Sequence, residues 1–395
     1  MACGVNKLPL HLKLMFVLIG LLPFVPSPGS LVSIIFITSY IASAAMSLLT
    51  HFPRAVMDKT AILAIIIVFI LMPLNFLVSN TAEVSLSSFG RAIVPFLFLL
   101  SYTFAIQLRS ISVKHVENLL LIASVVWAIK ILVVFPQDFV DSLIGQLARL
   151  TYVASDMLVP FGMIGFILTI FSESIRGAKR FSLLLLFFLL IVASGYRSHI
   201  LIIAAAAIFK YRRIYSAKNF FMLSAFLVLG SAYLIINPEY VDMMKDRIHS
   251  SAGDNVREAE MDYAFERFSD RPIFGNGLGH PIPVSLTRTG STLDKFETDS
   301  VPYIHNFLGY VLMDLGIIGF VLFCALLVPI VVTSTNQVIF QRNRSIEGVW
   351  FCLISILLNF LVSASFRQIQ MWVVISFLMY ALKKGKHDKV AQYEA

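Results

Sequence analysis

Long apolar runs separated by short polar connections dominate the chain. A helix needs about 20 apolar residues to cross the hydrocarbon core of a bilayer, and it satisfies its own backbone polar groups there. The pattern therefore predicts an all-α polytopic membrane protein, with residues 1–395 forming a single membrane domain. The 12 predicted spans occupy residues 8–26, 31–49, 60–79, 89–108, 116–135, 152–171, 181–195, 198–210, 220–236, 305–332, 347–365 and 370–382.

Two stretches of this pattern allow a second interpretation. The run at 198–210 is short, so residues 181–210 could form one bent or re-entrant element instead of two spans. Residues 7–30 could be a signal peptide, because Lys7 and Lys13 precede an apolar core. We favour a first membrane helix there, and the later topology is the same in both cases.

The charge distribution changes this picture in one respect. Hydrophobic residues make up 58% of the chain and charged residues 14%, a composition that excludes an ordinary soluble domain. The net charge of +8 comes mostly from Lys and Arg in short loops between apolar runs, which argues against nucleic acid as a partner. Cytoplasmic loops carry such an excess, so both termini are predicted to be cytoplasmic. Merging residues 181–210 would put loops of opposite charge character on one side, which favours separate spans.

The longest connection, residues 237–304, lies on the predicted outer side and is expected to form a folded cap. Loops of that length are uncommon unless they are functional or disordered. Residues 254–268 show helical spacing and predict an amphipathic helix near the outer membrane surface. Its predicted apolar positions are Val256, Met261, Phe265 and Phe268. A turn-rich segment, RPIFGNGLGHPIP, follows.

Several cations lie on the predicted outer side, against the general charge trend. Arg197 lies in SGYRSH, a very tight turn between two spans, and Arg257 lies in the large loop. Arginine binds phosphate oxygens through paired hydrogen bonds and stays charged when partly buried, so both are candidates for binding pyrophosphate. Each could instead extend toward water or pair with an acid. Further candidates at or near the outer ends of spans are Arg91, Lys130, Arg149 and Arg367.

His305 lies where the large loop meets the run at 305–332, and it is the candidate general base. In the first turn of a helix, the positive end of the dipole favours a neutral imidazole that can accept a proton. The alternative is a histidine that only hydrogen-bonds a loop, and His280 is a weaker candidate. Asp314 lies nine residues after His305, and a structural partner is expected for its carboxylate inside a span.

No motif in the chain predicts a metal or a cofactor. GNGLG lacks the following Lys-Ser/Thr and the strand–helix unit of a phosphate-binding loop, so its glycines are expected to make a tight turn. The carboxylates of the large loop show no compact metal spacing. Cys324 and Cys352 lie inside apolar runs, without metal-ligand spacing or a likely disulfide role.

Three stretches of the chain resemble the O-antigen ligase and O-antigen polymerase family of bacterial membrane glycosyltransferases. ASGYRSHILI is similar to the serine–arginine turn of that family. VREAEMDYAFERFSDRPIFGNGLG is similar to its arginine-led helix and the glycine-rich turn that follows. HNFLGYVLMDLGIIGF is similar to its histidine–asparagine helix start, with Asp314 where the family more often has glutamate. The resemblance covers residues 190–325.

This resemblance implies a GT-C-like fold in the bacterial inner membrane, with the active site facing the periplasm. The implied donor is a glycan on undecaprenyl pyrophosphate, bound by Arg197 and Arg257, and His305 would activate the acceptor hydroxyl beside Asn306. The implied reaction is a single inverting displacement without a metal. The acceptor would be lipid A–core for a ligase, which the size and layout favour, or a second lipid-linked glycan for a polymerase. A polysaccharide transporter or flippase is the alternative from another class.

Overall fold

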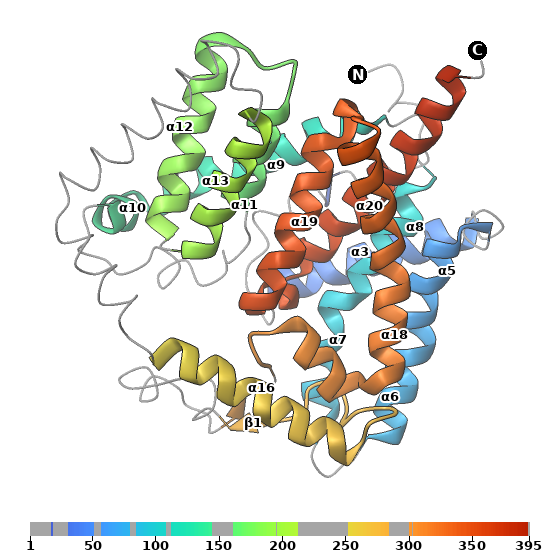
Figure 1. Cartoon of the computed structure of the whole chain (residues 1–395). Coiled ribbons are helices and arrows are strands. Elements are labelled where there is room, and N and C mark those ends of the chain that lie inside the picture. Colours follow the sequence, from blue (N-terminus) through green and yellow to red (C-terminus); the bar gives the residue numbers. More distant parts are fainter. Residues whose placement is uncertain are drawn as a thin grey trace. The chain divides into compact units, whose positions relative to one another are not determined.

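A computed structural model describes residues 17–18, 31–50, 57–79, 84–107, 112–143, 161–194, 196–211, 252–283, 300–301 and 303–393. The predicted span at 220–236, nearly all of the span at 8–26, and Arg149 lie outside these residues. The described chain is almost entirely helical (Figure 1). Its only strands, β1 (Ile282–Pro283) and β2 (Ser300–Val301), form one short antiparallel ladder in the large loop.

The described residues form two compact units, which are treated separately below. The helices of the first unit are α3 (Leu31–Thr50), α5 (Lys59–Ile66), α6 (Met72–Val78), α7 (Leu86–Leu97), α8 (Ser101–Ala105), α16 (Ala252–Asp270), α18 (Phe307–Thr335) and α20 (Ile369–Tyr393). The second unit contains α10 (Pro136–Leu143), α11 (Phe161–Phe171), α12 (Gly177–Ser194) and α13 (Arg197–Tyr211). Helices α9 (Val113–Val134) and α19 (Glu347–Val362) each contribute residues to both units.

Six helical segments are long and apolar enough to cross a membrane, which confirms an all-α membrane protein. They are Lys59–Val78, Leu86–Ala105, Val113–Val134, Gly177–Ser194, Phe307–Phe340 and Arg344–Val362, and each overlaps a predicted span. Shorter apolar helices cover Ile34–Ser47, Phe161–Phe171 and Ser198–Tyr211. The total of 12 spans stays a prediction. Helices α12 and α13 are separate, as the charge pattern favoured, with only residues 195–196 between them.

An aromatic cluster anchors the start of α18 in the first unit. The ring of Phe307 lies 5.5 Å from that of Phe323, 5.3 Å from that of Phe366 and 5.7 Å from that of Trp372, centroid to centroid. The indole N–H of Trp372 donates a hydrogen bond to the carbonyl of Phe366 at 2.6 Å. Buried aromatic pairs of this kind stabilise beyond their burial area. The cluster therefore fixes Phe307, two residues after His305, against α20 and the segment that precedes it.

Helix α18 covers the span predicted at 305–332, but its backbone breaks at Gly316 (φ 65°, ψ −165°). The turn-rich segment at 271–280 packs into this break. Asn276 N–H donates to the carbonyl of Met313 at 2.8 Å, and Ile317 N–H donates to the carbonyl of Pro272 at 2.8 Å. An unpaired backbone group in an apolar interior is costly. The turn thus supplies the hydrogen bonds that the broken helix lacks.

Asn75 on α6 braces the same junction, and its side chain is 1% exposed. Its amide nitrogen donates to the carbonyls of Phe274 at 2.7 Å and Asp314 at 2.8 Å. Its amide oxygen accepts from the N–H of Leu278 at 2.9 Å. One side chain therefore joins α6, the turn and α18. Sequence analysis missed Asn75, because a lone amide in an apolar run carries no spacing signal.

The glycines of GNGLG form the expected tight turn, and they also allow close packing. Gly275 has φ +74°, and a Cβ there would lie 2.5 Å from the carbonyl oxygen of Asp314. Gly279 has φ +85°, and a Cβ there would lie 2.6 Å from the carbonyl oxygen of Ser88 on α7. Positive φ and backbone contact at such distances both favour glycine. The motif is thus explained by packing against α18 and α7.

We predict that Gly275→Ala destabilises the first unit. The left-handed conformation alone costs roughly 1–2 kcal/mol for a residue with a Cβ, and the contact with Asp314 adds to that. The apparent unfolding temperature of the detergent-purified protein should fall by several degrees. The matched control is Gly90→Ala on α7, where a Cβ meets nothing within 4 Å and alanine favours the helix. Equal unfolding temperatures for Gly275→Ala and the wild type would contradict this account.

Candidate active site

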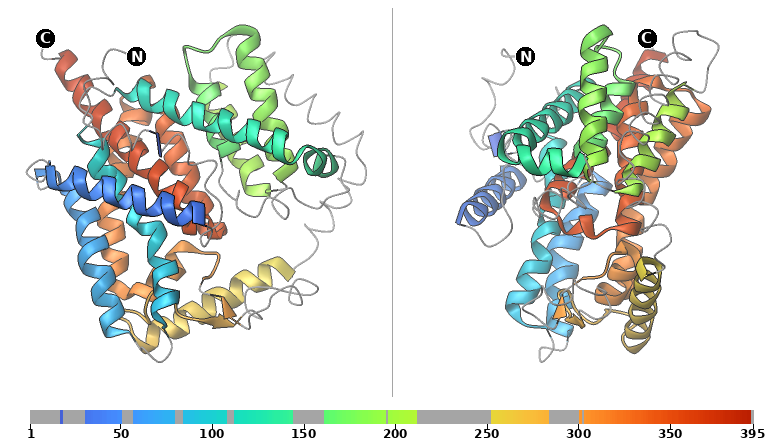
Figure 2. Two further views of the ribbon diagram at one scale, coloured as in Figure 1. Left: turned by 180° about the vertical axis from the view of Figure 1, so that it is seen from behind. Right: turned by 90° about the vertical axis from the view of Figure 1, so that its left-hand side faces the viewer.

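Helix α16 carries one half of the candidate site and packs against α18. It crosses the direction of α6 and α18 rather than running beside them (Figures 1 and 2). The prediction of a helix at 254–268 is confirmed, with two further residues at each end. The close approach of α16 depends on Gly309, because a Cβ there would lie 2.9 Å from Sδ of Met261 and 3.0 Å from Cδ1 of Ile304.

The buried face of α16 differs from the predicted apolar face. Phe265 was assigned to that face, but its side chain is 52% exposed. Glu260 and Ala264 are buried instead, at 1% and 2% exposure. A carboxylate is rarely buried unless it is paired or hydrogen-bonded. The partners of Glu260 therefore define the site.

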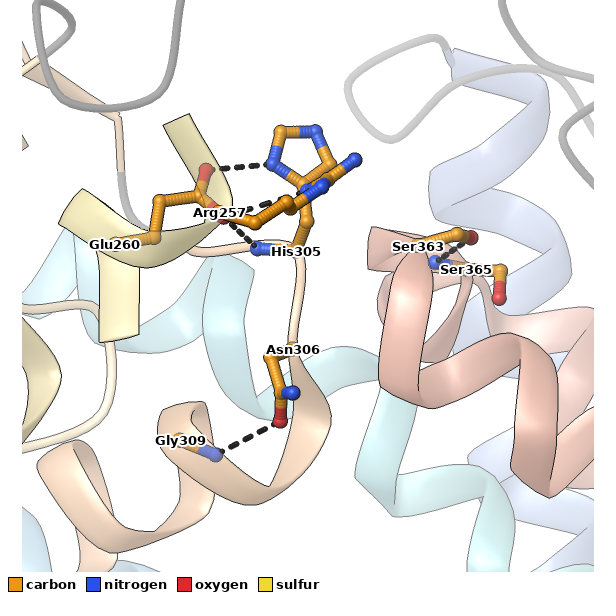
Figure 3. Close-up of polar contacts among 7 residues, drawn as sticks. All are labelled: Arg257, Glu260, His305, Asn306, Gly309, Ser363 and Ser365. Carbon is orange, nitrogen blue, oxygen red and sulfur yellow. Dashed lines mark hydrogen bonds and ion pairs between the residues drawn. The ribbon is translucent and has the colours of Figure 1, made fainter. Parts of the chain in front are cut away.

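Glu260 holds His305 by two hydrogen bonds (Figure 3). Its Oε1 lies 2.6 Å from Nδ1 of the imidazole, and its Oε2 accepts from the backbone N–H of His305 at 3.0 Å. The side chain of His305 is 16% exposed, so the ring is mostly enclosed. The structure thus brings together two residues 45 positions apart in the chain.

With Glu260 ionised, this contact assigns the proton of the neutral imidazole to Nδ1. An ionised carboxylate only accepts hydrogen bonds, so Nδ1 must be protonated to donate to Glu260. In the neutral ring, Nε2 is then the acceptor, with its lone pair available for a substrate proton. A carboxylate that orients a histidine in this way also stabilises the imidazolium that forms when the base takes a proton. The pair has the geometry of a general base and its orienting acid.

Arg257 lies one turn before Glu260 on the same helix, and its Nη1 is 3.3 Å from Oε2 of Glu260 (Figure 3). Its side chain is 41% exposed, so much of the guanidinium surface remains accessible. The pair thus joins an accessible guanidinium to a buried carboxylate. Its place beside His305 is compatible with the predicted binding of an anion.

Helix α18 begins at Phe307, two residues after the predicted start of this span at residue 305. His305 therefore precedes the N-cap and does not lie in the first turn. The contact with Glu260, and not the helix dipole, then determines the protonation state of its imidazole. Asn306 is the N-cap, and its Oδ1 accepts from the N–H groups of Leu308 at 2.9 Å and Gly309 at 3.1 Å (Figure 3). Asn306 thus supports the site by fixing where the helix begins.

Two further side chains extend the cluster beyond His305. The ring of Tyr303 meets the His305 ring edge-to-face, with centroids 5.8 Å apart. The guanidinium of Arg367 lies over the same Tyr303 ring, 4.0 Å from its centroid. Burial lowers the pKa of Arg367, while the hydroxyls of Tyr303 and Tyr310 oppose that shift. Arginine nevertheless stays charged at this position, given its very high ordinary pKa.

Asp314 and His280 both lie where the turn at 271–280 packs against α18. The side chain of Asp314 is fully buried, its Oδ2 accepts from the N–H of Gly279 at 3.3 Å, and it forms no ion pair with a described residue. Its structural role stays a prediction. His280 is 2% exposed, and its Nε2 lies 3.4 Å from the hydroxyl of Tyr263. Its enclosure makes it a poor candidate base.

The other predicted cations come from other helices. Arg91 is exposed on α7, with no ion pair to another described residue. Arg197 is the first residue of α13 and Lys130 lies on α9, both in the second unit. Their predicted roles stay predictions. Nowhere in the described part of the chain do three or more His, Cys, Asp or Glu side chains gather as a metal site would need.

Glu260 is the site residue that sequence analysis missed. The available signal was the spacing of Arg257 and Glu260, three positions apart on a predicted helix, which lets their side chains meet. The surrounding carboxylates Glu258, Asp262 and Glu266 are all exposed. Only the packing of α16 against α18 distinguishes Glu260 from them.

The fold and this site define a polytopic helical membrane protein with an oriented histidine at a loop–helix boundary. Residues 181–324 match the family model described as O-antigen ligase. The match covers the turn before α13, α16 and the start of α18, so the resemblance drawn from 190–325 is confirmed. A comparison with curated proteins gives no match. This match supports O-antigen ligase or polymerase activity in the broad sense.

We predict that Glu260→Gln lowers turnover by about 10²-fold or more, because the amide can no longer act as an ionised acceptor that stabilises the imidazolium. The readout is the rate of glycan transfer at saturating donor. The matched control is Glu258→Gln, an exposed residue two positions away on α16 that should leave turnover unchanged. Transfer at the wild-type rate by both variants would show that Glu260 does not act through His305.

Proposed function

We propose that this protein is a glycosyltransferase that moves a glycan from undecaprenyl pyrophosphate to an acceptor sugar on the periplasmic side of the bacterial inner membrane. The observation that carries the proposal is the 2.6 Å contact between Glu260 and Nδ1 of His305. It leaves Nε2 as the proton acceptor beside Arg257, within the matched family region. An oriented base next to a cation suits transfer from a donor whose leaving group is a pyrophosphate.

The proposed reaction is a single inverting displacement. His305 Nε2 takes the proton of the acceptor hydroxyl while that oxygen bonds to the anomeric carbon and the bond from this carbon to the pyrophosphate oxygen breaks. Negative charge grows on the departing pyrophosphate, and Arg257, with Arg197 and Arg91, would stabilise it. The pyrophosphate is already a good leaving group, so a base, cations and positioning suffice. Lys130 and Asp314 keep supporting roles in this proposal.

A ligase is the favoured form of this activity, with lipid A–core as the acceptor. A polymerase would use a second lipid-linked glycan instead, and the two share the site described above. The proposed topology has both termini in the cytoplasm and the loop at 237–304 in the periplasm, which rests on the distribution of Lys and Arg. A GT-C-like arrangement of the helices and a single membrane domain belong to the same proposal.

A polysaccharide transporter or flippase is the alternative function. Many apolar helices suit it, but the chain has one dominant loop and no evident repeat of halves, which many transporters have. An oriented histidine–carboxylate pair is also a feature that a transporter of neutral glycans does not require. The enzyme proposal accounts for both observations.

The first test is a reconstituted transfer assay with the purified protein and an undecaprenyl-pyrophosphate glycan. We expect product when lipid A–core is supplied, as a ligase requires, and none from donor alone. Longer lipid-linked chains from donor alone would instead show a polymerase. Absence of product with either acceptor, from protein that unfolds cooperatively, would contradict the glycosyltransferase proposal and favour the transporter.

The second test removes the proposed base. His305→Ala should lower the transfer rate by about 10²–10⁴-fold, the usual contribution of a positioned general base. The control is His115→Ala, which replaces an exposed histidine on α9. Transfer by His305→Ala at the wild-type rate would remove His305 from the mechanism, whereas unfolding temperatures show whether either variant is misfolded.

A further inference from the structure

Arg367 lies in a short helical turn, Ala364–Arg367, that connects α19 to α20. The turn is held firmly, because Ser363 Oγ accepts from the N–H of Ser365 at 3.1 Å and Trp372 donates to the carbonyl of Phe366 at 2.6 Å. The backbone that carries Arg367 is therefore fixed in the aromatic cluster of the first unit. A guanidinium on such a support has a defined position.

The guanidinium is aligned with the candidate base through one aromatic ring. It lies 4.0 Å from the centroid of the Tyr303 ring, and the same ring meets His305 edge-to-face. Stacking on an aromatic face leaves the N–H groups at the edge of the guanidinium plane able to donate hydrogen bonds. Arg367 and Arg257 thus approach His305 through different partners, one through Tyr303 and the other through Glu260.

Arg367 is half-buried, and no carboxylate of another described residue lies within ion-pair distance of it. The other arginine of this site, Arg257, does have a carboxylate partner at 3.3 Å. A cation withdrawn from water without an anionic partner is destabilising unless something else supplies the negative charge. Tyr303 offsets part of this cost, and an anionic ligand would offset more.

We propose that Arg367 binds a phosphate group of a substrate beside His305. This inference rests on the proposed function, and it adds a cation from the connection between α19 and α20, outside the matched region at 181–324. The phosphate belongs either to the pyrophosphate of the donor or to a phosphorylated acceptor. In both cases Arg367 contacts the substrate and positions it against Nε2 of His305.

The binding test uses undecaprenyl pyrophosphate in detergent micelles, with uncharged undecaprenol as the comparison lipid. Arg367→Gln should weaken binding of the pyrophosphate lipid about tenfold and leave binding of undecaprenol unchanged, as expected for the loss of a charged hydrogen bond. The affinity of Arg367→Lys for the pyrophosphate lipid should lie between those of the wild type and Arg367→Gln, since lysine keeps the charge but loses the planar fork. The matched control is Arg344→Gln, an exposed arginine in the turn before α19.

Steady-state transfer kinetics distinguish the two sources of the phosphate. A tenfold rise in the KM for the donor, together with weaker binding of undecaprenyl pyrophosphate, assigns Arg367 to the donor. A similar rise in the KM for the acceptor, with unchanged binding of the donor lipid, assigns it to the acceptor. Each result supports the proposal, and Arg367→Lys provides the measurement if Arg367→Gln does not fold.

Wild-type binding and KM values in both Arg367 variants would overturn the inference while leaving the proposed glycosyltransferase intact. A change in unfolding temperature alone, with both KM values and lipid binding unchanged, would assign Arg367 a purely structural role and also overturn it. Failure of the wild-type protein to bind the pyrophosphate lipid and to transfer glycan would overturn the proposed function together with this inference. The two failures are therefore distinguishable.

Discussion

The hydrogen bonds that repair the break in α18 are the constraint on which the first unit depends. A helix interrupted at Gly316 leaves N–H and carbonyl groups without partners, and apolar surroundings make such groups costly. The turn at 271–280 and the amide of Asn75 supply the missing partners. The same turn directly follows α16, so satisfying the break also fixes the helix that carries Glu260 and Arg257. A structural requirement thus determines where the candidate site lies.

The site itself is a meeting of two segments at one end of α18. Glu260 comes from the buried face of α16, and His305 comes from the residue before the N-cap of the helix. Gly309 lets α16 come close enough for a direct hydrogen bond. Anchoring of Phe307 in the aromatic cluster holds the other side of the contact. A base whose partners are fixed before substrate arrives needs little reorganisation during the reaction, which is how preorganised sites lower a barrier.

Cations are distributed around this base by different structural means. Arg257 pairs with the same carboxylate that orients His305, so one acid has both an orienting and a charge-balancing role. Arg367 stacks on Tyr303 instead, which leaves its hydrogen-bond donors less committed. An enzyme that handles a pyrophosphate benefits from cations whose charge is not fully neutralised in the free state. In the proposed role of Arg367, the connection between α19 and α20 contributes to the site together with the large loop.

The sequence by itself determined the all-α membrane class. The length and apolar character of a run decide whether it can cross a bilayer as a helix, and both are local properties of the chain. It also identified α16, the separation of α12 from α13 and the tight GNGLG turn, and it proposed His305 and Arg257 as candidate site residues. Tertiary structure decided the rest. Helical spacing placed Phe265 inward, but packing buried Glu260, since a carboxylate can be buried when a distant residue supplies its hydrogen bonds. Asn75 and the partners of Arg367 depend on contacts between residues far apart in the chain, which no local pattern encodes.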